Sequence, residues 1–388
     1  MSPRHPAGDI IRRMDPRDDD GAATRWQVHP DVARAETLDK AFYLDPAVQT
    51  LQREHLFARS WQWLGDVHDA AVPGALWPRT LLPGCLDEPL LLSCDSAGEL
   101  RCLSNVCTHR GNLLVQEPRQ GQKQIRCGYH SRRFELDGRM VFMPEFQQAQ
   151  DFPRPCDHLP QLAWQVWGGH AFVALESPWA SFDEVFGPLR DRLGWLPLGD
   201  FRLDPSASRD YEFDAHWALY VENYLEGLHI PFVHPALTQA LDLTQYSYEL
   251  LPWANLQLAV ARDDELAFDL PAGSLDQGRR IAAYYYWVFP NLMLNFYPWG
   301  LSVNQVLPAG PSRTRVLFRS YVWEPDLQGQ GAGGALHQVE MEDEAVVMTV
   351  QQGLRSRFYQ RGRYSPTREQ GVHHFHRLIG QVLGAVSG

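Results

Sequence analysis

The chain has 388 residues, which is enough for two or three domains with separate cores. Hydrophobic residues make up 44% and charged residues 21%, the composition of an ordinary soluble globular protein. The net charge of −12, with no basic stripe, argues against nucleic acid as a partner, and no apolar run approaches the ~18 residues that a membrane span requires.

The first 60 residues divide into a polar tail and a helical segment. Residues 1–25 are rich in Asp, Arg and Pro, contain no apolar run resembling a signal peptide, and are expected to be disordered. In the segment 26–60 a helix is predicted after Asp45, which would cap it, with Pro46 at its first position. The missing signal peptide and the count of six cysteines predict a cytoplasmic protein whose cysteines serve metal binding or catalysis.

The rest of the chain predicts a small β domain and a larger α+β domain. In 61–176, short apolar runs alternate with Pro, Gly and Asp turns, which is typical of an all-β unit. Residues 177–208 resemble a linker with one helical piece, and 177–388 form the second domain. There we expect strands at 282–289 and 315–323, a glycine-rich loop at 329–334, and helices at 336–360 and 366–386.

Two Cys/His pairs, separated by 17 residues, form the first metal-binding pattern. Cys107-Thr-His109 and Cys127-Gly-Tyr-His130 each offer a thiolate and an imidazole from a tight turn. Two Cys and two His suit either zinc or a 2Fe–2S cluster in which one iron takes both histidines. Zinc sites more often pair Cys with Cys and His with His along the chain, so the alternation favours two hairpin loops around a cluster.

These motifs, with Leu136-Asp-Gly138 after them, resemble the Rieske domain of ring-hydroxylating and related oxygenases. The resemblance extends over roughly residues 40 to 380. One departure is Arg132-Arg133, where many members carry an aromatic residue. The remaining cysteines, Cys85, Cys94, Cys102 and Cys156, lie outside the motif, and we interpret them as small buried residues.

The segment from Glu222 to Pro235 contains the second pattern. His229 and His234 are five residues apart, at a point where Pro231 must disturb a helix, and Glu226 falls three residues before the first histidine on the same helix face. Two His and one carboxylate with open positions are typical of non-haem Fe(II) oxygen chemistry. This segment resembles the iron-binding helix of the Rieske oxygenase catalytic domain.

The resemblance assigns roles to three further residues. It places the third iron ligand on a late helix, at Asp343. The neighbouring Glu340, Glu342 and Glu344 compete for that role, but we interpret them as a solvated acidic face. It also makes Glu226 a bridge between His130 of one subunit and His229 of the next, or else a support for His229 alone, and it places Asn223 near the iron.

Three weaker patterns are given structural interpretations. His373, His374 and His376 crowd one C-terminal helix, and we expect them to lie on a partly exposed surface rather than to bind a metal. His216 is interpreted as structural. The aromatic run from Tyr284 to Trp299 predicts strands under the active site, where most rings serve core packing, although an aromatic box would suit a cation.

Together these observations predict an α+β protein: an N-terminal all-β Rieske domain (61–176) and a helix-grip-like catalytic domain (177–388) with a central antiparallel sheet, on which 26–60 packs. The resemblance implies one 2Fe–2S cluster and one mononuclear Fe(II) per subunit, a homotrimer, O2 and an external reductase or ferredoxin. Glu226 favours hydroxylation or demethylation of a small quaternary ammonium compound over aromatic-ring dioxygenation. A Rieske electron carrier or a structural zinc protein would leave the second pattern unexplained.

Overall fold

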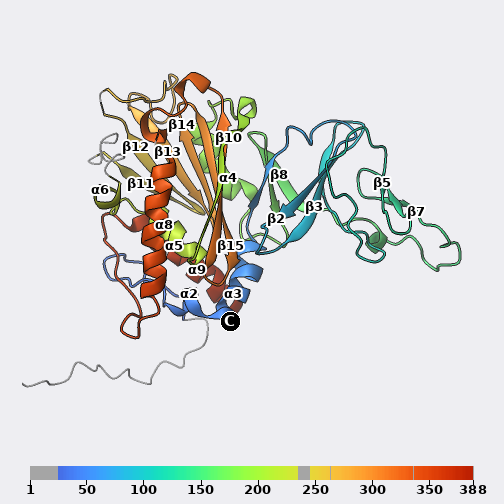
Figure 1. The fold of residues 1–388 in the computed structure, drawn as a ribbon, viewed down its shortest axis with the longest axis horizontal. Coiled ribbons are helices and arrows are strands. Elements are labelled where there is room, and N and C mark those ends of the chain that lie inside the picture. Colours follow the sequence, from blue (N-terminus) through green and yellow to red (C-terminus); the bar gives the residue numbers. More distant parts are fainter. Residues whose placement is uncertain (1–24, 235–244, 263, 335, 388) are drawn as a thin grey trace, which may run out of the picture.

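The computed structural model describes residues 25–234, 245–262, 264–334 and 336–387. The tail predicted to be disordered therefore lies, apart from Arg25, outside the described residues. The chain forms a broad sheet covered by helices and an elongated β part that projects from it (Figure 1). No helix within these ranges is long and apolar enough to cross a membrane.

The N-terminal segment is helical, and its predicted cap is confirmed. The Asp45 side chain accepts the backbone N–H of Ala47, and Pro46 starts the helix because its missing N–H costs nothing there. The aromatic rings of this segment pack against later helices: Phe57 lies 5.0 Å from Trp217, which lies 5.8 Å from Phe375. The helices are α2 (Ala41–Leu44) and α3 (Pro46–Leu51), followed by a π-helical turn, η1 (Gln52–Phe57).

The projecting part contains only antiparallel sheets of three strands each. A sheet in the order β1-β9-β8 joins it to the rest of the molecule, and the sheets β2-β3-β4 and β5-β6-β7 carry the outer end. The predicted all-β unit is thus confirmed. Its strands are β1 (Gln62–Asp66), β2 (Leu76–Leu81), β3 (Glu88–Cys94), β4 (Leu100–Ser104), β5 (Ile125–Arg126), β6 (Arg133–Phe134), β7 (Met140–Phe142), β8 (Ala163–Trp167) and β9 (His170–Ala174).

A seven-stranded antiparallel sheet in the order β10-β16-β15-β14-β13-β12-β11 forms the centre of the second part. Side chains alternate between its faces, so the register places Gln257, Tyr285 and Asn295 side by side on one face, while Tyr284 and Tyr286 point into the core behind it. The strands are β10 (Arg202–Phe213), β11 (Ser247–Leu251), β12 (Ala254–Val260), β13 (Ile281–Val288), β14 (Leu292–Tyr297), β15 (Gly300–Gly310) and β16 (Arg313–Val322).

Helices cover the sheet, and two of them end or begin at other residues than predicted. Helix α8 ends at Gly353, not near residue 360, and α9 begins at Gln370, after turns that include Pro366. The region predicted as a linker ends as strand β10, which pairs with β16. The helices are α4 (Phe182–Leu193), α5 (Trp217–Tyr224), α6 (Ile230–Val233), α8 (Leu336–Gly353) and α9 (Gln370–Ser387), with 3-10 turns at Pro155–Asp157, Leu198–Asp200, Pro325–Leu327 and Gly331–Gly333.

Candidate metal centres

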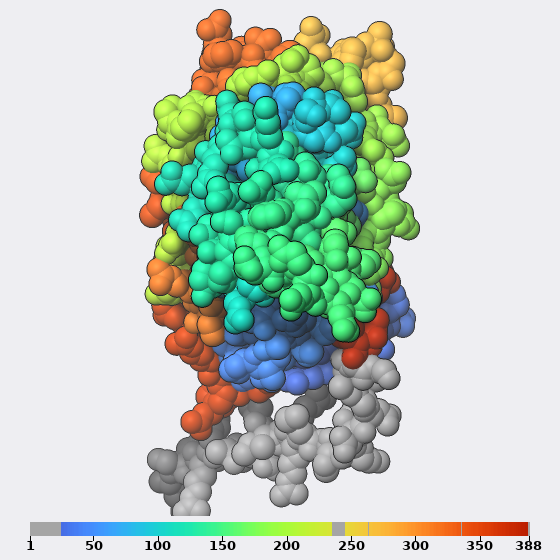
Figure 2. All heavy atoms as spheres, turned by 90° about the vertical axis from the view of Figure 1, so that its right-hand side faces the viewer, coloured from blue at the N-terminus to red at the C-terminus, as the bar shows by residue number. Residues whose placement is uncertain are grey.

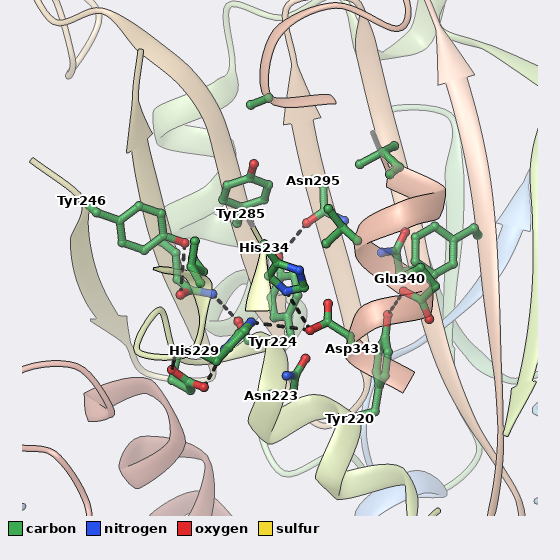
Figure 3. A pocket seen from close by; sticks show the side chains of 18 of the residues that line it. Tyr220, Asn223, Tyr224, His229, His234, Tyr246, Tyr285, Asn295, Glu340 and Asp343 are labelled. Atoms are coloured by element: carbon green, nitrogen blue, oxygen red, sulfur yellow. Dashed lines mark hydrogen bonds and ion pairs between the residues drawn. The ribbon is translucent and has the colours of Figure 1, made fainter. Parts of the chain in front are cut away.

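Two histidines and one aspartate meet in a pocket between the central sheet and helices α5, α6 and α8. One ligand atom from each of His229, His234 and Asp343 can be chosen so that all lie within 4.8 Å of one another. Figure 3 shows both rings directed at Asp343, with Asn223 beside them and Tyr246 and Tyr285 on the sheet side. The three residues that the sequence singled out for iron are therefore brought together from two distant segments.

The local chain path explains how the two histidines converge. Helix α5 ends at Tyr224, and the short helix α6 begins at Ile230 with Pro231 in its first turn. His229 precedes α6 and His234 follows it, which sets their rings 5.0 Å apart and nearly perpendicular. The spacing predicts that Glu226 and His229 share a helix face, and this prediction is wrong. Glu226 lies in the turn between the helices, where its Oε2 accepts the backbone N–H of His229.

The donor geometry of these residues fits a divalent iron. His234 Nε2 lies 2.9 Å from Asp343 Oδ1, and His229 Nε2 lies 3.5 Å from the same oxygen. Each outer nitrogen is held by a separate carboxylate: His229 Nδ1 by Glu226 at 2.6 Å, and His234 Nδ1 by Glu342 at 2.7 Å. Such outer contacts fix the ring so that its inner nitrogen faces a metal. Two imidazoles and one carboxylate on one side are the donor set of non-haem Fe(II) sites.

The acidic residues of α8 do not form the solvated face that was expected. Glu340 is 3% exposed and Glu344 is 7% exposed. Glu340 lines the pocket and accepts a hydrogen bond from the Tyr220 hydroxyl at 2.6 Å. Burial raises the pKa of the Glu340 carboxyl well above its ordinary value, because an apolar environment disfavours the charged form. Of the three glutamates, Glu342 is the one that is partly exposed, and it contacts His234.

The second candidate centre lies at the outer end of the β part. Cys107 and Cys127 are buried, and the Nδ1 atoms of His109 and His130 face each other at 3.2 Å. The two loops have equivalent hydrogen bonds. The backbone N–H of Gly111 donates to the carbonyl of Cys107, and the backbone N–H of Ser131 donates to the carbonyl of Cys127. Both Gly111 and Ser131 adopt positive φ, which closes each turn.

The donors of these loops fit a two-iron cluster better than a single zinc. Around one zinc, all four donors would crowd together, yet within the described ranges only the His229, His234 and Asp343 set gathers three donors so closely. Cys127 Sγ also accepts hydrogen bonds from Asn112 Nδ2 and from the Tyr129 N–H. Hydrogen bonds to sulfur are one means by which proteins tune iron–sulfur clusters.

Arg132, one of the two residues at which the sequence departs from the expected motif, supports the second loop through contacts with Asp157 and two aromatic rings. Its side chain is buried and bonds to Asp157 at 2.9 Å. The guanidinium lies 5.6 Å from the centre of the Phe134 ring and 5.5 Å from that of Phe152. Arg132 therefore occupies an aromatic environment in place of an aromatic side chain, which explains how the loop tolerates the departure.

Two interpretations of the remaining histidines and cysteines were wrong. His373 and His376 are buried, because α9 packs one face into the core: His373 bonds to the His29 carbonyl and His376 to the Tyr364 hydroxyl. Cys156 is exposed, since it lies in a 3-10 turn at the surface. His216 is structural as expected: it is fully buried and caps α5 by accepting the Ala218 N–H.

Sequence reasoning missed the second carboxylate and three tyrosines of the pocket, Tyr220, Tyr224 and Tyr246, whereas Tyr285 and Tyr297 fall within the aromatic run expected under the active site. Nothing in the spacing of Glu342 marks it as the partner of His234, because the contact joins residues 108 positions apart. Tyr285 and Tyr297 follow the alternation of β13 and β14, so the register could have shown that they face the pocket. Tyr220 required knowledge of where α5 meets α8.

Comparison with known families covers both parts of the chain. Residues 60–153 match the Rieske [2Fe–2S] domain, and residues 201–385 match the catalytic domain of the ring-hydroxylating alpha subunit. These two matches coincide with the candidate cluster site and the candidate iron site, respectively.

Relatives and solved structures extend the match to nearly the whole chain. Chloroplastic choline monooxygenase of Arabidopsis thaliana is 29% identical, over 90% of this chain and 83% of its own length. The oxygenase subunit of carnitine monooxygenase from Escherichia coli K12 is 25% identical, over 90% and 94%. A solved quaternary ammonium Rieske monooxygenase shares the fold at a TM-score of 0.74 with 24% identity, over 91% of this chain and 96% of its own. Naphthalene 1,2-dioxygenase from Rhodococcus sp. shares it at 0.69 with 19% identity, over 91% and 95%.

Proposed function

This chain is a Rieske non-haem iron oxygenase with a 2Fe–2S cluster and a mononuclear iron, and on that premise we propose that it hydroxylates or demethylates a small quaternary ammonium compound. The observation that carries the proposal is the wall of the iron pocket. Five tyrosines line it together with Phe318, namely Tyr220, Tyr224, Tyr246, Tyr285 and Tyr297. Aromatic faces attract quaternary ammonium groups, and relatives over 90% of the chain act on choline and carnitine by name.

The proposed ligands follow from the geometry above. His229, His234 and Asp343 would hold the iron, and Cys107, His109, Cys127 and His130 would hold the cluster. When bound, the two centres supply oxygen activation and electron storage. The protein's own residues fix the ligands: Glu226 and Glu342 orient the two imidazoles, and the Asn223 side chain lies in the pocket beside them.

Electrons would pass between subunits of a homotrimer. The cluster loops near β5 and β7 lie at one extreme of the molecule, and α6, beside the iron site, lies at the other (Figure 1). Figure 2 faces the cluster end, where the segments from about residue 100 to 150 project outward. Exposed aromatic side chains occur at both ends, with Tyr129 62% and Phe232 80% exposed. A head-to-tail contact would cover both ends, and three such contacts close a ring.

Glu226 is the proposed link across that contact. Its Oε1 already holds His229, and its side chain is 14% exposed. The arriving partner would be His130 of the partner subunit. A solved relative was described as revealing inter-subunit electron transfer, which supports the same arrangement here.

The electron source and the compartment are proposed on the same basis. We propose that an external reductase or ferredoxin reduces the cluster, because the two matched domains are a Rieske domain and an oxygenase catalytic domain. All six cysteines are unpaired, as is usual in the reducing cytoplasm, which is where we place the enzyme.

Oxygen uptake with a surrogate reductase and NADH tests the proposal. We expect uptake coupled to product formation with choline or L-carnitine, with one O2, two electrons and two protons consumed per oxygen atom inserted. Naphthalene and indole serve as probes for the alternative, an aromatic-ring dioxygenase, which the shared fold with naphthalene 1,2-dioxygenase keeps open. Coupled oxidation of an aromatic probe, and none of any ammonium compound, would overturn the proposal.

A further inference from the structure

We infer that the pocket selects cations without an anionic group, so that a trimethylammonium alcohol binds and a trimethylammonium carboxylate is rejected, with Glu340 as the residue that sets this preference. The inference rests on the proposed function and narrows it. It answers a question that the relatives leave open, since choline carries only a positive charge whereas carnitine also carries a carboxylate.

Apart from the two histidines and the iron that they would share with Asp343, the ionisable side chains that line the pocket are acids. Its acids are Glu226, Glu340 and Asp343, and among the described residues that line it there is no Lys or Arg. A carboxylate taken from water into such a pocket would lack a counter-charge from the protein, which is costly at low dielectric.

Four of the five tyrosine hydroxyls donate to other pocket residues and are therefore not free to solvate an anion. Tyr220 donates to Glu340, Tyr224 donates to Asn295 at 2.7 Å, and Tyr246 donates to Gln257 at 3.2 Å. The remaining two, Tyr285 and Tyr297, are hydrogen-bonded to each other. These bonds fix the rings so that their aromatic faces, rather than their O–H groups, are available to a ligand.

Glu340 is the acid best placed to receive a cation. Glu226 is engaged with His229, and Asp343 with both histidines, whereas the Oε1 of Glu340 receives no hydrogen bond from the described residues. Tyr220 holds the other oxygen, and Glu340 is also hydrogen-bonded to Glu344, which lies one helical turn further along α8. A cation in the pocket would favour the ionised carboxylate of this buried acid.

Four ligands test the inference by equilibrium binding to the iron-loaded enzyme, measured by calorimetry. Choline and 3,3-dimethyl-1-butanol have the same shape and differ in the positive charge. L-carnitine and its methyl ester share a skeleton and differ in the negative charge. We expect choline to bind at least about tenfold more tightly than the neutral alcohol, and the ester at least about tenfold more tightly than carnitine.

The variant Glu340→Gln isolates the residue, since it keeps the shape and still accepts from Tyr220. We expect the Kd for choline to rise about tenfold or more, that of the neutral alcohol to change less than about twofold, and the preference for ester over carnitine to shrink. Glu249→Gln is the matched control, because Glu249 pairs with Arg192 outside the pocket and should leave all four Kd values unchanged. Visible absorption of the cluster verifies that each variant is folded.

The outcomes separate this inference from the function it rests on. If carnitine binds wild-type enzyme as tightly as its ester, the charge preference is wrong while the ammonium-oxidising function stands. If choline binds no better than its neutral analogue, the proposed substrate class fails. If Glu340→Gln leaves the choline Kd unchanged while both wild-type preferences hold, the role of Glu340 is overturned.

Discussion

Each histidine of the proposed iron site is fixed by its own carboxylate, and the two carboxylates serve different surroundings. Glu342 is partly exposed on α8 and contacts His234, whereas Glu226 lies in the turn that would face a neighbouring subunit. Burial lowers the pKa of His234, but the contacts with Asp343 and Glu342 outweigh it and raise the pKa overall. The pKa of the His234 ring is therefore set mainly by its two acidic partners.

Replacing Asp343 by Ala should remove the only acidic ligand in the proposed iron set. We expect turnover to be lost and the mononuclear iron content to fall, with the visible spectrum of the cluster unchanged, because the two centres lie in separate parts of the chain. Metal analysis and absorption measure both effects. Glu342→Ala is the comparison, with a smaller loss of about 10- to 100-fold in iron affinity. Normal iron content in the Asp343 variant would move the ligand to a neighbouring glutamate.

Replacing Glu226 by Gln should separate electron transfer from metal loading. Both centres should load, since neither loses a ligand, and a chemical reductant should still reduce the cluster. Transfer to the iron should slow by about 10- to 100-fold, because the contact that orients both imidazoles weakens. Stopped-flow single turnovers measure this rate, and Glu226→Ala should be slower still. A wild-type rate in both variants would leave Glu226 without a bridging role.

At this scale the sequence predicted the residues that meet in the iron pocket but not what surrounds them. The spacing of His229 and His234 around Pro231 was informative because a proline forces the break that lets both rings converge. The burial of Glu340 and Glu344 could not be predicted, because acidic residues on a helix are normally solvated and only the position of α8 against α5 reverses this.

At the scale of elements, helix α5 is the support for the site, and it is held by polar contacts along its length. His216 caps its start, and Glu222 in its last turn accepts from Tyr43 at 2.7 Å and lies 3.1 Å from His376. These contacts tie α5 to the N-terminal segment and to α9. The position of Asn223 and of the turn with Glu226 thus depends on elements at both ends of the chain.

The cap of α5 predicts a dependence of stability on pH. Burial lowers the pKa of His216 to about 3, so the folded protein keeps it neutral while the unfolded chain protonates it below about 6.5. Stability should therefore fall as pH decreases below about 6.5, by about 1.4 kcal/mol per pH unit for this residue. His216→Asn keeps a capping side chain that does not titrate and should make this slope shallower by one proton. Denaturant unfolding at pH 5 to 8 measures the free energy of unfolding of both proteins. Equal slopes of this free energy against pH below 6.5 in the wild type and the variant would contradict the role given to His216.

The strands were predicted better than the ends of the helices. The expected strands at 282–289 and 315–323 correspond to β13 and β16. Their short runs of apolar and aromatic residues are typical of strands in a buried sheet. The end of α8 at Gly353 was missed because the prediction ran the helix on toward residue 360, although Gly353 is itself a typical signal for the end of a helix.

At the scale of the whole molecule, the separation of the two metal-binding regions governs how activity can arise. With the cluster loops and α6 at opposite extremes, a single subunit cannot bring its own two centres into contact. The proposed ring solves this by joining the end of one subunit to the opposite end of the next.

Mixed oligomers test that arrangement directly. A His130→Ala subunit lacks a cluster ligand, and a Glu226→Gln subunit lacks the bridge, so oligomers of either alone should have little activity. In a random equal mixture, about a quarter of the head-to-tail contacts join an intact cluster to an intact bridge, and activity should recover to about that fraction. Oxygen uptake on refolded or co-expressed mixtures measures it. Failure of the mixture to exceed its two components would place the path within one chain.

The β1-β9-β8 sheet also has a consequence for how such enzymes diversify. The cluster-binding core is built from side chains between Leu76 and Leu159, while Trp63 of β1 and Phe172 of β9 lie in the core of the catalytic part. The chain enters the outer unit after β1 and returns from it as β8, and these two strands lie on either side of β9. A gene segment bounded by these two points carries the whole cluster-binding core, and it can be exchanged if it keeps the side chains, such as Leu81, Leu90 and Leu92, that also pack into the core shared with the catalytic part. Recombination there would give one substrate pocket a cluster of different reduction potential, so that electron input and substrate choice can evolve independently.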